Sequence, residues 1–173
     1  MIYALDLLRT LQNLPIETHL VVTQGAKQVI PTELSETVLE IEALADIVYK
    51  DADLGAAISS GSYRTQGMVI VPCSAGTLAK VAHGFADNLI ARAAHVTLKE
   101  RRPLIMVLRE APYSRPMLQN MLGAHDAGAA ILPASPGFYH RPETVADLVG
   151  TVTARALDLL GIDNERAQRW RES

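Results

Sequence analysis

The sequence predicts an α/β protein built on a doubly wound parallel sheet, and three observations lead to this fold class. Residues 103–108 (PLIMVL) are entirely apolar, as in a strand that is buried on both faces of a parallel sheet. A second apolar run, residues 67–71 (GMVIV), precedes it. Strand-like and helix-like segments alternate along the chain, with no hairpin signal and no internal repeat.

The first half of the chain alternates between helices and strands. Residues 1–14 predict an amphipathic helix, because apolar side chains recur on one face and a proline follows. A strand over 16–23 leads into a helix that starts at residue 24, and residues 31–35 are expected to break it. The remaining expected elements are a helix over 36–46, a strand over 47–49, a short helix over 54–58 and a loop over 59–62.

The second half continues the alternation around the two apolar runs. Small and hydroxyl-bearing residues at 72–77 follow the strand over 67–71 and lead into a helix over 78–83. A helix over 88–99 delivers the chain into the strand over 103–108. After it we expect a helix over 114–127, a strand over 129–133, a loop over 134–141, a long helix over 142–160, and a polar tail that contains Trp170.

Composition limits the class of protein. With 173 residues, 49% of them apolar, the chain fits one α/β domain over residues 1–160, followed by a tail over 161–173. A net charge of −3 predicts no nucleic-acid partner, and no apolar run is long enough to predict a membrane span. The single cysteine, Cys73, is interpreted as a core residue, and it predicts no disulfide, no metal site and a cytoplasmic location.

Polar or charged residues stand at four expected strand ends. An open α/β sheet binds its ligands at the carboxyl ends of its strands, so these segments are expected to line one crevice. They are Thr23-Gln24-Gly25, residues 73–77, Arg109-Glu110 and residues 135–141. The sequence has no nucleophile elbow, no phosphate-binding loop with a lysine and no metal-binding histidine pair, which argues against hydrolases, kinases and metalloenzymes.

Four segments resemble, in order and spacing, the flavin prenyltransferase (UbiX) family: PCSAGTL, NLIARAAHVTLKERRPL, VLREAPYS and ILPASPGFYHRPETVADLV. The resemblance implies a Rossmann-like flavoprotein fold that binds reduced FMN as a substrate. It further implies transfer of a dimethylallyl group from dimethylallyl monophosphate to N5 and C6 of the flavin, without a metal. The product would serve a UbiD-type decarboxylase, and the family implies a homo-oligomer, a dodecamer, with sites shared between subunits.

The same resemblance assigns roles to individual residues of this sequence. For FMN it implies a binding turn and two further contacts: Ser74, Ala75, Gly76 and Thr77, together with Thr23 and Arg109. For the prenyl phosphate it implies Lys99, Tyr139 and Arg155. Glu33 and Glu110 match carboxylates near the flavin, where one would accept the C6 proton and the other would donate to the departing phosphate; which does which stays open.

The sequence departs from the family pattern at its start. Met1-Ile2-Tyr3 matches the inside of the family's first helix, so we expect the family's first strand and its Gly-Ala-Ser-Gly turn to be absent from this sequence. Two other functions stay open. One is an FMN-dependent peptidyl-cysteine decarboxylase, which would lack the phosphate-binding set, and the other is a truncated, non-catalytic flavin-binding paralogue.

Lys99 and Arg109 are expected at opposite ends of one strand. Six extended residues span about 20 Å, which is too far for a single small pocket. We therefore predict that Lys99 of one subunit or Arg109 of another completes a neighbour's site.

Overall fold

The structure is a computed structural model, and residues 1–164 of it are described. The expected tail over 161–173 lies mostly outside the described residues, and Trp170 lies entirely outside them. Within 1–164 the helices are α1 (Ile2–Leu11), α2 (Gln24–Glu33), α3 (Val38–Glu42), α4 (Ala75–His83), α5 (Leu89–Lys99), α6 (Arg115–Asp126) and α7 (Val145–Leu159), with a short 3-10 helix over Ala57–Ser59. The strands are β1 (His19–Val21), β2 (Ile47–Tyr49), β3 (Met68–Cys73), β4 (Leu104–Leu108) and β5 (Ala130–Pro133).

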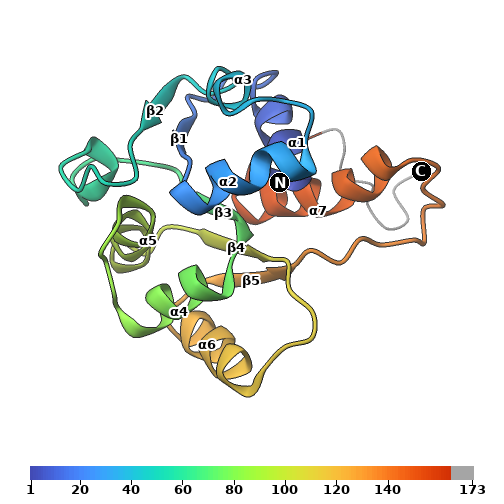
Figure 1. Ribbon diagram of the computed structural model, residues 1–173. Coiled ribbons are helices and arrows are strands. Elements are labelled where there is room, and N and C mark those ends of the chain that lie inside the picture. Colours follow the sequence, from blue (N-terminus) through green and yellow to red (C-terminus); the bar gives the residue numbers. More distant parts are fainter. Residues whose placement is uncertain (165–173) are drawn as a thin grey trace.

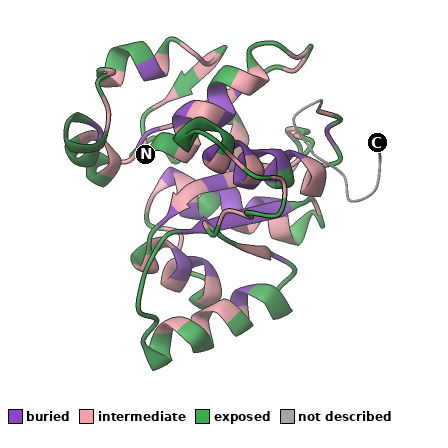
Figure 2. Cartoon of the chain, turned by 90° about the vertical axis from the view of Figure 1, so that its right-hand side faces the viewer, coloured by how far each residue is buried: buried purple, intermediate pink, exposed green. Residues whose placement is uncertain are grey.

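A three-stranded parallel sheet forms the centre of the fold, with β4 between β3 and β5 (Figure 1). Met68 of β3 is in register with Leu104 of β4, and Ile105 of β4 with Ala130 of β5. All five residues of β4 are buried, which confirms the strand that the apolar run predicted. Figure 2 shows buried residues gathered along these strands and exposed residues on the outer helix surfaces.

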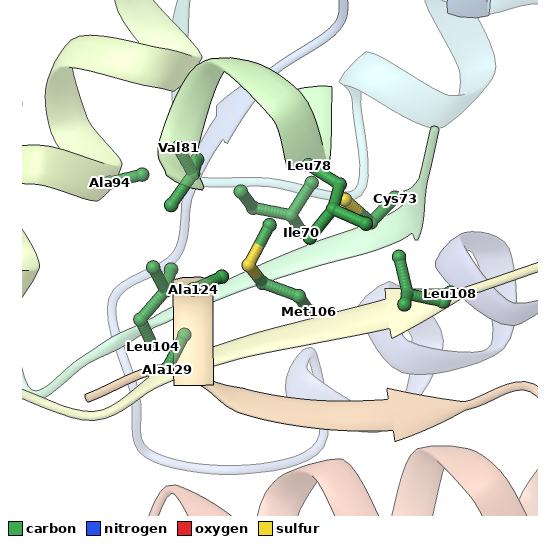
Figure 3. Close-up of a cluster of buried hydrophobic side chains, with 10 residues drawn as sticks. All are labelled: Ile70, Cys73, Leu78, Val81, Ala94, Leu104, Met106, Leu108, Ala124 and Ala129. Atoms are coloured by element: carbon green, nitrogen blue, oxygen red, sulfur yellow. The ribbon is translucent and has the colours of Figure 1, made fainter. Parts of the chain in front are cut away.

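The two faces of this sheet are covered by different helices. Leu104, Met106 and Leu108 point into a cluster with residues of α4, α5 and α6, part of which Figure 3 shows. Ile105 and Val107 point to the other face, where they meet residues of α7. Because successive side chains of a strand point to opposite faces, the apolar run supplies buried side chains to the helix layers on both faces of the sheet.

A second parallel sheet contains only β1 and β2, with His19 in register with Ile47. The Asp46 carboxylate closes its end, since it accepts hydrogen bonds from Thr18 N at 2.7 Å and from Thr18 Oγ1 at 2.8 Å. No strand within residues 1–164 joins β1 to β3, so the sheet has two parts. All strand pairs are parallel, which confirms the predicted α/β class. The absence of the family's first strand stays a prediction.

Helix α2 differs from the expected break over 31–35. The helix runs through Pro31 and ends at Glu33. Leu34 N donates to Ile30 O at 2.9 Å, so the backbone hydrogen bonds resume directly after the proline. The prediction failed because a proline near a helix end removes only one hydrogen bond of the last turn.

None of the helices within 1–164 is long and apolar enough to cross a bilayer.

Shortening a buried side chain of the central strand β4 tests this packing. Met106 is fully buried, and Met106→Ala should lower the free energy of unfolding by about 2–5 kcal/mol because it leaves a cavity between β4 and the helices above it. Denaturant unfolding measures the change. The control is Leu118→Ala on α6, which is 52% exposed and should change stability by about 0.5 kcal/mol or less. Equal effects of the two substitutions would contradict the described core.

Candidate active site

Two helix N-termini stand at strand ends, and each is capped by a hydroxyl side chain. Thr23 follows β1, and its Oγ1 accepts a hydrogen bond from Ala26 N at 3.0 Å. Ser74 follows β3, and its Oγ accepts from Thr77 N at 3.2 Å. Each cap orients a first helical turn whose remaining N–H groups are free to bind an anion or a carbonyl oxygen.

The turn after β3 leaves open space in front of its backbone. A Cβ added at Gly76 would approach only Ser74 Oγ, at 3.9 Å, and Ala75 and Thr77 beside it are half-buried. The Ser74 and Thr77 hydroxyls lie 3.1 Å apart. This turn therefore presents hydroxyl and peptide groups on an open surface. A flat ring with polar atoms at its edge can form hydrogen bonds with such groups.

Glu33 and Arg109 come together although they are 76 residues apart. Arg109 Nη2 donates to Glu33 Oε1 at 3.3 Å, and Glu33 Oε2 pairs with the amino group of Met1. The Met1 ammonium, and then the Arg109 guanidinium, hold the pKa of the Glu33 carboxyl below its ordinary value. One predicted carboxylate and one predicted flavin-binding cation thus share a position at the carboxyl end of β4.

Glu110 and Tyr139 lie on loops at the same edge of the three-stranded sheet. Glu110 follows β4, is exposed, and its Oε1 accepts from Ala111 N at 3.2 Å. Tyr139 lies in the loop after β5, where it is 67% exposed and its ring contacts His140 edge-on. Both side chains can therefore be reached by a ligand.

Lys99 lies elsewhere, at the end of α5. It lines an open depression of about 410 Å³ together with Ser60 and Gly61 of the preceding loop. Its Nζ pairs with Glu100 Oε1 at 2.9 Å. Arg92 and His95 line the same depression but were not predicted. Their spacing of three and seven residues along one helix face, from Arg92 to His95 and Lys99, is the signal that could have identified them.

The predicted phosphate-binding residues do not meet within one chain. Arg155 lies on α7, 60% exposed, and pairs with Asp158 at 3.6 Å. Helices α5 and α7 cover opposite faces of the sheet, so Lys99 and Arg155 belong to different layers (Figure 1). Tyr139 and Arg155 are both absent from the depression beside Lys99.

Comparisons with known proteins identify the family to which the chain belongs. The sequence model described as "Flavoprotein" matches residues 1–154. The chain belongs to the Flavoprotein family. A protein of Deinococcus radiodurans named flavin prenyltransferase UbiX is 65% identical over 170 residues, which are 98% of this chain and 87% of that protein. These matches confirm the resemblance that the sequence motifs carried.

Two solved structures of Flavoprotein-like chains superpose closely on this fold. The crystal structure of AnUbiX in complex with FMN and dimethylallyl pyrophosphate has a TM-score of 0.96 at 42% identity, over 99% of this chain and 92% of that one. A dodecameric FMN-dependent UbiX-like decarboxylase from Escherichia coli O157:H7 has a TM-score of 0.94 at 46% identity, over 98% of this chain and 92% of that one.

Cys73 of this Flavoprotein-family chain is a core residue. Its side chain packs beside Ile70 and Leu78 (Figure 3), and burial raises the pKa of its thiol to about 12. We expect the folded protein to react slowly with a disulfide reagent at pH 8, because the thiol is both covered and protonated. Gln119→Cys, which adds a thiol at an exposed position of α6, serves as the fast internal control. Equally fast labelling of Cys73 would contradict its burial.

Proposed function

We propose that this protein is a flavin prenyltransferase, which joins the dimethylallyl group of dimethylallyl monophosphate to N5 and C6 of reduced FMN. The observation that carries the proposal is the near full-length similarity to a relative named flavin prenyltransferase. The structural neighbour crystallised with FMN and dimethylallyl pyrophosphate supports FMN and a phosphate ester of the dimethylallyl group as the substrates.

The strand-end residues fit reduced FMN. Thr23 and Ser74 offer capped helix N-termini, Gly76 leaves space for a ring edge, and Arg109 supplies a cation at the end of β4. As a substrate, reduced FMN supplies the two positions that gain the prenyl group. In our proposal Thr23, the residues 74–77 and Arg109 bind and orient it.

The prenyl phosphate needs cations and hydroxyl groups, since the departing group is an anion. Lys99, Tyr139 and Arg155 provide them, and charge stabilisation at the leaving oxygen eases cleavage of the C–O bond. Lys99 and Arg155 lie in different layers of the chain. We therefore propose that each phosphate site takes Lys99 from one subunit and Arg155 from another, in a homo-oligomer like the dodecameric neighbour.

The two glutamates provide proton transfer. Glu33 pairs with Arg109 at the carboxyl end of β4, and we assign its carboxylate to accept the proton that leaves C6. Glu110, on the exposed loop after β4, is then available to interact with the departing phosphate. Arg109, which pairs with Glu33, holds that carboxylate at the flavin side of the site.

Other expectations extend this function beyond the chain itself. We propose that the product is delivered to a UbiD-type decarboxylase. Cytoplasmic location and independence of metals stay predictions. Within residues 1–164 no group of three or more metal-ligating side chains gathers at one place.

The test of the proposal is formation of the product. The purified protein, incubated without oxygen with reduced FMN and dimethylallyl monophosphate, should yield a flavin heavier by one isoprenyl unit and release inorganic phosphate. Mass spectrometry of the extracted flavin measures it. Dimethylallyl pyrophosphate in a parallel reaction decides between the two phosphates, and we expect faster turnover of the monophosphate. An unchanged flavin mass with both donors would contradict the proposal.

A further inference from the structure

Helix α5 ends in a turn that directs two cationic side chains toward one loop. Arg101 N donates to Leu98 O at 2.9 Å and Arg102 N donates to Thr97 O at 2.9 Å, the hydrogen-bond pattern of a Schellman motif. Arg101 takes the left-handed conformation of that motif, with φ of 56°. Lys99, the last helical residue, and Arg102, two residues past the helix cap, are thereby fixed relative to each other.

The loop over 60–67 lies between these two side chains. Arg102 Nη2 donates to Gly61 O at 2.8 Å and Nη1 donates to Tyr63 O at 2.8 Å, with Thr65 Oγ1 at 3.4 Å from Nη1. The guanidinium fork thus binds two carbonyl groups of the loop at once, and a third group lies at the limit of hydrogen-bond distance. Arg102 is half-buried under the loop.

Gly61 is also in close contact with Lys99. A Cβ added at Gly61 would lie 2.8 Å from Lys99 Nζ and would overlap the Glu100 carboxylate. The absence of a side chain at this position therefore leaves the room that the Glu100 carboxylate and the Lys99 ammonium paired with it occupy. Since Arg102 holds the Gly61 carbonyl, the position of the loop and the position of Lys99 are linked through one residue.

We propose that Arg102 is a positioning residue of the prenyl-phosphate site: it holds the 60–67 loop where Gly61 leaves space for the ion pair of Lys99 and Glu100. This inference rests on the proposed role of Lys99. Arg102 does not touch the substrate and acts through the loop. Arginine is suited to this task because its planar fork donates to two acceptors in fixed directions, whereas the single ammonium of lysine is a point charge.

The test replaces Arg102 with lysine, which keeps the charge and loses the fork. In Arg102→Lys the KM for dimethylallyl monophosphate should rise about tenfold, because the loop loses a hydrogen bond to the guanidinium and no longer holds Lys99 in place. The KM for reduced FMN should change by less than about twofold, because the FMN residues lie at other strand ends. Amide hydrogen exchange in residues 60–67 should become faster.

Arg101→Lys is the matched control, since it makes the same substitution one residue earlier. No hydrogen bond or ion pair of the Arg101 side chain is found within residues 1–164. Its kinetic constants and loop exchange should equal those of the wild type. A second variant, Gly61→Ala, keeps the carbonyl groups that Arg102 binds and displaces the flexible ends of Glu100 and of Lys99, which pairs with it. It should raise the same KM without faster loop exchange.

The outcomes separate this inference from the proposed function. Unchanged loop exchange in Arg102→Lys would overturn the positioning role. Faster exchange with an unchanged KM for the prenyl phosphate, or equal rises in both KM values, would overturn the link to the phosphate site. If the wild type forms no prenylated flavin, the proposed function fails. Amide hydrogen exchange and calorimetric titration with dimethylallyl monophosphate then test the positioning role of Arg102 without any turnover. Equal affinities of the wild type and Arg102→Lys for this ligand would contradict the inference.

Discussion

The burial of β4 on both faces is the constraint on which the rest of the structure depends. Its alternating residues pack against α4, α5 and α6 on one side and against α7 on the other. No ligand can enter a sheet that is filled in this way, so chemistry is confined to the strand ends and the outer helix surfaces. The same packing assigns Lys99 and Arg155 to different layers. We therefore propose that a small substrate that binds both residues lies at a junction between chains.

Local patterns allowed the sequence to predict much of this architecture. The uninterrupted apolar run over 103–108 predicted β4, because a polar residue on either face of a central strand would be buried without a partner. Helix α5 was predicted almost to the residue, since Asn88 caps its start and an apolar stripe follows. Ser74 was placed at a strand end and confirmed as a cap. For α5 and for the Ser74 cap the deciding interactions lie within one or two helical turns of the chain.

Other features depend on contacts between distant segments, and the sequence could not predict them. The pair between Glu33 and Arg109 requires that α2 continues through Pro31, which sequence reasoning took for a break. The division of the sheet into two parts follows from which strands pair, and strand pairing is decided by packing of the whole chain. The hydrogen bonds of Arg102 to the 60–67 loop join residues about forty positions apart.

Mixed oligomers test the sharing of sites between subunits most directly. Chains with Lys99→Met and chains with Arg155→Met, each inactive toward the prenyl phosphate alone, are co-expressed with two different affinity tags and purified over both. If each site takes Lys99 and Arg155 from different chains, about a quarter of the sites in an equal random mixture keep both residues. The account predicts that turnover returns to about a quarter of the wild-type rate for such a mixture. Mixed oligomers no more active than the separate variants would contradict it.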